Sequence, residues 1–303
     1  MKGDMLMKRN EHIDNYEQTM LNEEAIYAEY VKKDIKDDFM FGKVMQKKEN
    51  CIGLLECLTG NRIEDVNTVT SQKSVKITSD SKGVRYDIYV EDDKKRIYDA
   101  EMQNYRKESD VKELPKRVRF YQGMIDLNIL QSGADYHLLK ESYIIFICTF
   151  DPFGGDLCCY EFENVCKYDE KIKLNDKRKV LIFNTKGKIV NVGKSTKDFL
   201  DYIETKKVTD DFTKKIDSEV ALVRQNREWM VEYMKTLVHD MDIRNEAKAE
   251  GISETIIEFL SEYGAVPEEL KERIYNEKDT SILKQWNKLS ARVSSIEEFV
   301  ERM

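Results

Sequence analysis

Three side chains on two neighbouring segments have the types and spacing of a metal site. The stretch "GVRYDIYVEDDKKRIYDAEMQ", residues 83–103, places Asp87 in one alternating segment and Glu101 with Gln103 in the next. On a β-strand, residues i and i+2 face the same way, and a hairpin brings such positions alongside one another. We therefore expect two carboxylates and one amide to converge.

Magnesium prefers a donor set of this kind. It takes one or two carboxylate oxygens and a backbone carbonyl such as that of Met102, while water and a substrate phosphate complete the octahedron. An ion held by Asp87, Glu101 and Met102 would activate water, and Gln103 would orient that water for attack on a phosphodiester. Because charged hairpin faces are usually only solvated, an ordinary hairpin is the alternative interpretation.

The strands that would position these residues are visible as period-two alternation. "GVRYDIYVE" and "RIYDAEMQ" alternate on either side of the charged turn "EDDKK", which predicts a hairpin. Three later apolar segments predict further strands: "SYIIFICTF", "CCYEFENVC" and "KVLIFNT". The turn material "DPFGGD" and "KLNDKR" separates them. The sequence therefore predicts a mixed α/β fold in which helices flank a core sheet.

Helical periodicity surrounds the expected strands. Apolar spacing predicts one helix or a helix pair over about 37–59, with Gly60 as its stop. A second helix is expected to begin near Pro115 and to end at Gly133. Beyond about 196 the pattern is helical almost throughout, and three residues are expected to interrupt it: Gly251, Gly264 and Pro267.

Three regions follow from these patterns. They are a polar N-terminal segment (1–34), an α/β core (35–195) and an acidic, all-helical C-terminal region (196–303). The third region carries most of the net charge of −8, since residues 200–303 hold 23 acidic and 16 basic side chains. The front of the chain is thus nearly neutral, and the overall charge does not argue against contact with nucleic acid there.

Composition excludes several other classes of protein. The chain of 303 residues is 41% hydrophobic and 36% charged, which is typical of a globular protein that buries a core. No apolar run approaches the ~18 residues of a membrane span, so we expect no membrane partner and a cytoplasmic location. The six cysteines form no C-x-x-C pair, and the three histidines are scattered, which leaves carboxylates as the candidates for catalysis.

The order of several motifs resembles one known family. The motifs are "KDDFMFGKVM", "GVRYDIYV", "YDAEMQ", "LPKRVRFYQ", "SGADYHLLKESYIIFICTFDPFG" and "NTKG". Together they resemble the PD-(D/E)xK nuclease family transposases, also called Rpn recombination-promoting nucleases, over about residues 35–190. The resemblance implies a restriction-endonuclease-like core and metal-dependent cleavage of DNA with Mg²⁺, for which Mn²⁺ can substitute.

The resemblance also implies roles for individual residues. The metal-binding aspartate and glutamate of the family fall on Asp87 and Glu101, and the usual lysine position falls on Gln103. Glutamine there departs from the general superfamily pattern, although E-x-Q is a common form in this family. Since glutamine brings no positive charge to the transition state, slow or conditional cleavage is one expected consequence.

Further residues have two interpretations each. Asp38, at the expected start of a helix, is either an N-cap, which we favour, or an additional acid near the metal. Arg117 and Tyr121 match the R…Y positions of the family, and they either hold a DNA phosphate or are a solvated arginine and a tyrosine at the core edge.

A basic segment also has two interpretations. Residues 171–188 contain seven basic side chains and one acidic side chain. Lys177, Arg178 and Lys179 would track a DNA backbone if they lay beside the site, whereas a charge run is more often a solvated turn.

The expected function is that of a metal-dependent DNA endonuclease linked to recombination or mobile elements. DNA is the expected partner, and a second copy of the chain is a candidate partner. The first alternative is a catalytically weak, nuclease-like module that binds DNA or protein. The second is a structural adaptor that makes no contact with nucleic acid.

Overall fold

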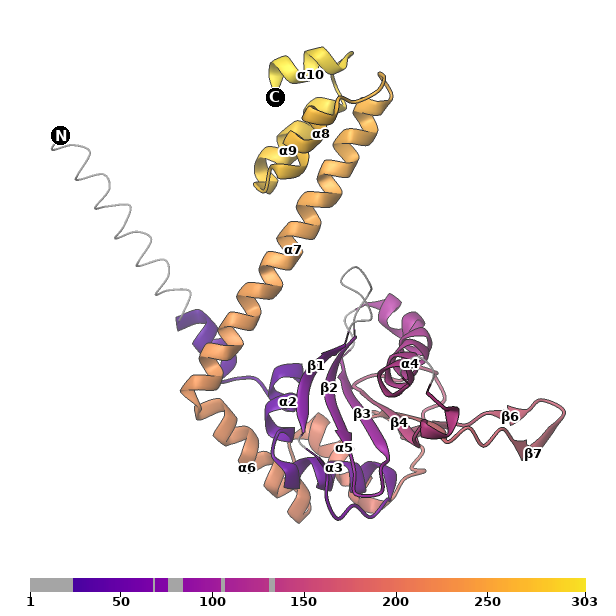
Figure 1. Cartoon of the computed structure of the whole chain (residues 1–303). Helices are drawn as coiled ribbons and strands as arrows, with labels where there is room; N and C mark the ends of the chain where they lie inside the picture. Colours follow the sequence, from indigo (N-terminus) through magenta and orange to yellow (C-terminus); the bar gives the residue numbers. More distant parts are fainter. Residues whose placement is uncertain (1–23, 68, 76–83, 105–106, 131–133) are drawn as a thin grey trace. The chain divides into compact units, whose positions relative to one another are not determined.

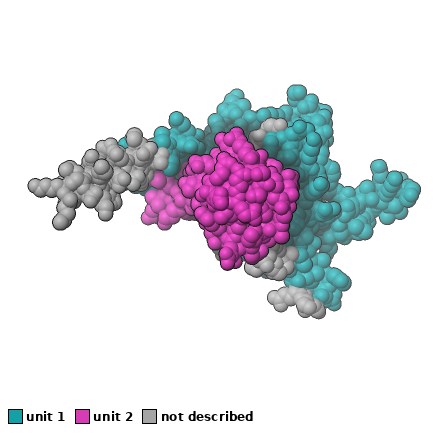
Figure 2. All heavy atoms as spheres, turned by 90° about the horizontal axis from the view of Figure 1, so that it is seen from above, with its two compact units in different colours: residues 1–227 teal, residues 228–303 magenta. Residues whose placement is uncertain are grey.

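The chain folds into two compact units, residues 1–227 and 228–303 (Figures 1 and 2). The computed structural model describes residues 24–67, 69–75, 84–104, 107–130 and 134–303. Within these segments, every helix is too short or too polar to span a lipid bilayer.

A six-stranded mixed sheet forms the centre of the first unit, with the order β1-β2-β3-β4-β8-β5. Strands β1 to β3 are antiparallel neighbours, β3, β4 and β8 run parallel, and β5 returns antiparallel at the edge. The strands are β1 (Thr70–Val75), β2 (Val84–Glu91), β3 (Ile97–Gln103), β4 (Ser142–Cys148), β5 (Cys159–Phe162) and β8 (Arg178–Asn184).

The register of the parallel strands places their carboxyl ends at one edge of the sheet. Gln103 of β3 lies opposite Cys148 of β4, which in turn lies opposite Asn184 of β8. Just beyond this level, the Thr149 N–H donates to the Gln103 carbonyl (3.0 Å). The expected site residues Glu101 and Gln103 therefore lie at the carboxyl edge, where open α/β sheets commonly bind ligands.

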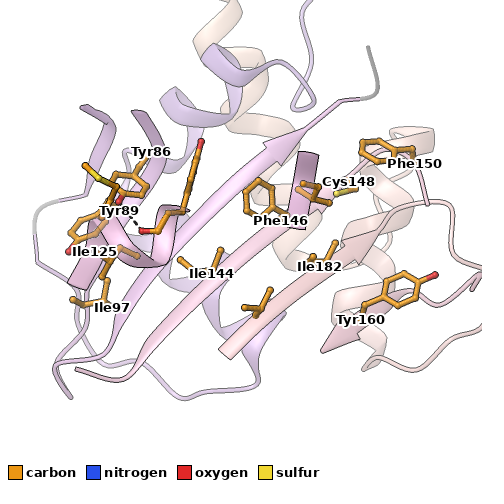
Figure 3. Close-up of a cluster of buried hydrophobic side chains, with 14 residues drawn as sticks. Tyr86, Tyr89, Ile97, Ile125, Ile144, Phe146, Cys148, Phe150, Tyr160 and Ile182 are labelled. Atoms are coloured by element: carbon orange, nitrogen blue, oxygen red, sulfur yellow. Dashed lines mark hydrogen bonds between the residues drawn. The ribbon is translucent and has the colours of Figure 1, made fainter. Parts of the chain in front are cut away.

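Helices cover both faces of this sheet (Figure 1). Helix α4 (Glu108–Ile129) packs on one face, and the other face carries α2 (Asp38–Met45), α3 (Lys48–Thr59), α5 (Lys194–Thr205) and α6 (Asp211–Gln225). Figure 3 shows the core beneath α4, where Ile144, Phe146 and Ile182 of neighbouring strands lie together. Because both faces are covered, every residue of β4 is buried, which explains its continuous apolar sequence.

The expected helix over 37–59 is a pair, α2 and α3, and Gly60 ends it in the left-handed conformation (φ 69°). The N-cap of α2 is Asp37, whose carboxylate accepts hydrogen bonds from the Phe39 and Met40 N–H groups. The interpretation of Asp38 as the cap is therefore wrong. Asp38 is the first residue of the helix itself, because its neighbour already satisfies the exposed N–H groups.

Helix α4 begins earlier than the sequence analysis predicted. It starts at Glu108, where the Lys107 N–H donates to the Asp110 carboxylate (2.9 Å), so Pro115 lies inside the helix. Local capping thus outweighs the usual preference of proline for the first turn. The helix ends at Ile129, and the predicted stop at Gly133 lies outside the described residues.

The segment between β5 and β8 contains more strand than expected. "CCYEFENVC" divides into β5 and β6 (Val165–Cys166), and β6 pairs with β7 (Asp169–Lys173) as a separate two-stranded ribbon. Every residue of β7 is exposed, so it lacks the alternation of apolar and polar residues on which the strand predictions depended.

The C-terminal helical region is divided between the two units. Helices α5 and α6 pack against α2 and α3 in the first unit, and the boundary between the units falls after Arg227. The second unit consists of α7 (Arg227–Ser261), α8 (Glu268–Asn276), α9 (Thr280–Ser290) and α10 (Ile296–Arg302) around its own apolar cluster. Gly251 lies within α7 and does not interrupt it, whereas Gly264 and Pro267 separate α7 from α8.

The fold leaves no room for a side chain at one glycine after β8, Gly187. A Cβ at Gly187 would lie 2.5 Å from the Leu157 carbonyl oxygen and 2.7 Å from the Cys158 backbone. Because backbone atoms cannot move aside as side chains can, we expect Gly187→Ala to lower the free energy of unfolding by ~1–3 kcal/mol in urea denaturation. Gly123→Ala on α4, where a Cβ meets nothing within 4 Å, is the matched control and should be neutral or stabilising. Equal stability of the two variants would contradict the close approach.

Candidate functional site

The β2–β3 pairing ends beside the two expected carboxylates. The last paired residues are Ile88 and Ala100, and beyond them side chains replace the backbone ladder. The Asp87 N–H donates to Glu101 Oε1 (2.8 Å), while the Met102 N–H donates to Asp87 Oδ2 (3.0 Å). The Asp87 N–H thus anchors Glu101, and the Met102 N–H anchors Asp87. The two acids face each other where the β2–β3 pairing ends.

Helix α4 contributes a guanidinium to the same place. Arg117 donates to Gln103 Oε1 through Nη1 and to the Tyr121 hydroxyl through Nη2 (3.1 Å), and its Nη2 lies 3.8 Å from Glu101 Oε2. Its guanidinium carbon also lies 5.5 Å and 5.3 Å from the ring centres of Tyr121 and Phe146. The structure therefore brings Arg117 and Tyr121 to the carboxylate pair.

The amide of Gln103 is held at both ends. Its Oε1 accepts from Arg117, and its Nε2 donates to the Asn104 carbonyl (3.0 Å). This arrangement fixes which end of the amide faces the arginine, because only the oxygen can accept.

The electrostatics of the site are dominated by buried acids. Burial raises the pKa of Asp87 well above its usual value, and the charges of Glu101 and Asp38 raise it further. Burial also raises the pKa of Glu101, whose side chain is 4% exposed. Asp38 thus lies close enough to add negative charge to the site, which is the interpretation that the sequence analysis did not favour.

A third acid, Asp99, lies beneath this pair and was left out of the expected triad. It is two residues before Glu101 on β3 and has no exposed surface. Neither carboxyl oxygen of Asp99 accepts a hydrogen bond from a donor in the described structure. Burial, followed by the charge of Glu101, raises the pKa of Asp99, and a neutral Asp99 can donate its proton to the Glu101 carboxylate. The shared face of Asp99 and Glu101 was the sequence signal for this neighbour.

The donor set fits a divalent cation. The backbone N–H groups bind only Oδ2 of Asp87 and Oε1 of Glu101, so each carboxylate has a second oxygen, and that of Glu101, Oε2, lies 3.8 Å from Arg117 Nη2. The mutual repulsion of the buried acids also favours positive charge at this point. The described residues contain no cluster of three or more His, Cys, Asp or Glu side chains arranged to hold a metal. Water and substrate would have to supply the remaining ligands, as magnesium sites allow.

The predicted basic residues at the start of β8 lie elsewhere. Arg178 begins β8 and Asn184 ends it at the carboxyl edge, so Arg178 is about 20 Å from the level of Gln103 along the strands. Arg178 lies 3.9 Å from the carboxylate of Asp176, and Lys179 lies over the ring of Tyr143. The structure does not bring Lys177, Arg178 and Lys179 to the carboxylates, and their contact with DNA stays a prediction.

The burial of Asp99 predicts a pH dependence of stability. A carboxyl whose folded pKa is raised stabilises the fold fully below its unfolded pKa, near 3.8, and loses that contribution as pH rises through the folded pKa. Asp99→Asn removes this loss, so the free energy of unfolding of the variant relative to wild type should rise between pH 5 and pH 8.

Urea denaturation in EDTA at pH 5 and pH 8 measures this effect. The difference between variant and wild type should grow with pH, and the exposed Asp169→Asn on β7 should show no such growth. A difference that does not grow between pH 5 and pH 8 would contradict the raised pKa of Asp99.

Comparison with known proteins finds a family model that matches most of the first unit. The family model of the PD-(D/E)XK nuclease family transposases matches residues 35–219, which include every strand of the sheet and α4. No curated protein and no solved structure matches the chain. The matched region is more than half of the 303 residues. The chain therefore belongs to the PD-(D/E)XK nuclease family transposases.

Proposed function

We propose that this protein is a metal-dependent DNA endonuclease that hydrolyses phosphodiester bonds. The observation that carries the proposal is the pair formed by Asp87 and Glu101, held face to face where the β2–β3 ladder ends. Membership of a nuclease family supports nuclease-type activity and a DNA substrate. Recombination or mobile-element activity is the proposed setting, and a second copy of the chain is a proposed partner for cutting both strands.

The proposed cofactor is Mg²⁺, with Mn²⁺ as a substitute. Asp87, Glu101 and the Met102 carbonyl would hold the ion. The chemistry that a divalent cation supplies in such a site is activation of water and compensation of phosphate charge. In the hydrolysis, a water molecule loses a proton as its oxygen bonds to phosphorus, one phosphorus–oxygen bond breaks, and the leaving oxygen takes up a proton.

The protein groups around the ion have separable tasks. The anchoring N–H of Asp87 fixes Glu101 Oε1, and that of Met102 fixes Asp87 Oδ2, so both carboxylates are oriented before any ligand arrives. The described contacts of Gln103 use one hydrogen of its Nε2, and the second hydrogen can orient water or phosphate. Asp38 adds negative charge that strengthens the attraction for a cation.

A catalytically weak module that binds DNA or protein is the second candidate. It is favoured by the uncharged Gln103 and by the backbone contacts that already occupy one oxygen of each carboxylate. Metal affinity and DNA binding would persist in such a module, whereas cleavage would not.

Plasmid cleavage tests the first candidate directly. With supercoiled DNA and Mg²⁺ or Mn²⁺, we expect nicking that EDTA abolishes and that Asp87→Ala or Glu101→Ala reduces by about 10³-fold or more, because each removes an anchored ligand. Far-ultraviolet circular dichroism controls for folding, and Asp169→Ala on the exposed ribbon serves as the control variant. Cleavage that is insensitive to EDTA, or to both site variants, would refute the proposed site.

Thermal unfolding tests metal binding separately from catalysis. A ligand that binds the folded chain stabilises it by ~2.7 kcal/mol at a hundredfold excess over its dissociation constant. We expect the unfolding temperature of the wild type to rise with Mg²⁺ concentration, and Asp87→Ala to lose that rise. An equal rise in both proteins would place the metal elsewhere.

A further inference from the structure

The site contains a positively charged side chain, Arg117, which lies on helix α4 and not on strand β3. The position at which the family pattern usually has lysine is Gln103, which carries no charge. We infer that Arg117 of α4 is the catalytic cation of this site, and that Gln103 is the positioning residue that aims it. The inference rests on the proposed function, since it concerns the phosphate that the nuclease would cleave.

The contacts of Arg117 hold its guanidinium beside both carboxylates. One nitrogen donates to Gln103, and the other donates to Tyr121 and lies 3.8 Å from Glu101 Oε2. Stacking against the rings of Tyr121 and Phe146 adds a further restraint. A guanidinium held on several sides costs little additional reorganisation when negative charge develops on a phosphate.

Arg117 also retains access to a ligand. Its side chain is 33% exposed, whereas that of Glu101 beneath it is 4% exposed. A guanidinium carries five N–H donors, and the described hydrogen bonds use two of them. The remaining donors suit a phosphate, because two of them can contact two phosphate oxygens in parallel.

The residue type at 103 follows from the presence of Arg117. Glutamine accepts the arginine N–H through Oε1, which orients the guanidinium toward the acids. A lysine ammonium has donors only, so at the same position it would lose this bond and repel the arginine. An arginine on α4 and a glutamine on β3 therefore form one functional pair, and the strand lysine is unnecessary.

A structural role is the competing explanation for Arg117. In that case the guanidinium only neutralises the buried acids Asp87 and Glu101. Such a residue would affect stability and metal affinity, and its loss would leave kcat at saturating Mg²⁺ unchanged. This difference makes the two roles separable.

Four variants of the full chain test the inference with supercoiled plasmid and Mg²⁺. Arg117→Ala should lower kcat by about 10²–10³-fold, the usual effect of removing one transition-state donor. Gln103→Lys alone should also lower kcat, because it displaces the arginine. The double variant Arg117→Ala with Gln103→Lys should be at least about tenfold faster than Arg117→Ala, since the ammonium restores the missing charge. Arg119→Ala, from the exposed side of the same helix, is the matched control.

Two further readouts separate catalysis from binding and folding. DNA retention by Arg117→Ala in EDTA should be close to that of the wild type, and its circular dichroism spectrum should show an intact fold. Added guanidinium chloride at low millimolar concentration should raise the rate of Arg117→Ala and leave Arg119→Ala unchanged. Both results support direct contact between the guanidinium and the reacting phosphate.

Each contrary outcome has a defined meaning. One contrary outcome is that the wild type cleaves DNA and Arg117→Ala retains most of the wild-type kcat. Another is that neither Gln103→Lys nor added guanidinium restores activity to Arg117→Ala. Either outcome overturns the catalytic role of Arg117 and leaves the proposed function standing. If the wild type retains DNA but cleaves none with Mg²⁺ or Mn²⁺, the proposed function fails, and the catalytic role fails with it.

Discussion

The linked anchoring of Asp87 and Glu101 is the constraint on which the rest of the site depends. The Asp87 N–H holds Glu101, and the Met102 N–H holds Asp87, at the point where the β2–β3 ladder would otherwise continue. The strands can separate there because the two carboxylates accept from the backbone, so the Asp87 and Met102 N–H groups each keep an acceptor. The same exchange turns the acids inward from two rigid strands, which gives them a fixed orientation.

This anchoring brings several acidic side chains together in a buried place. Asp99 and Glu101 are buried on one face of β3, and Asp38 approaches from the start of α2. Buried acids at this density are costly unless they are neutral or face a cation. Arg117 supplies part of the compensation from α4, and the sheet supplies the scaffold that keeps the acids together. Charge balance thus links the β2–β3 hairpin to helix α4.

The sequence predicted the features that have a local period. The hairpin, the fully buried strand β4, the helix stop at Gly60 and the helical C-terminus all follow from alternation, helical spacing or glycine geometry. Features that leave no periodic pattern in the sequence were missed or misplaced. Asp37 rather than Asp38 caps α2, and the ribbon strand β7 has no apolar face to reveal it.

The same distinction holds within the site. Asp87, Glu101 and Gln103 share a hairpin, so spacing suffices to bring them close together. The contact of Arg117 with Gln103 depends on how α4 packs across the sheet, and no spacing in the sequence encodes that angle. Conversely, Lys177, Arg178 and Lys179 formed a plausible basic cluster in sequence, but the parallel register of β4 and β8 puts them at the opposite edge.

The ribbon of β6 and β7 has a practical consequence for handling the protein. It projects from the first unit, its strands pair only with each other in the described chain, and Tyr168 at its turn is 93% exposed (Figure 1). A two-stranded ribbon without a covering layer has marginal stability of its own. It is therefore the natural point for limited proteolysis and for attachment of a spectroscopic label, since a cut or a probe there leaves the six-stranded sheet intact.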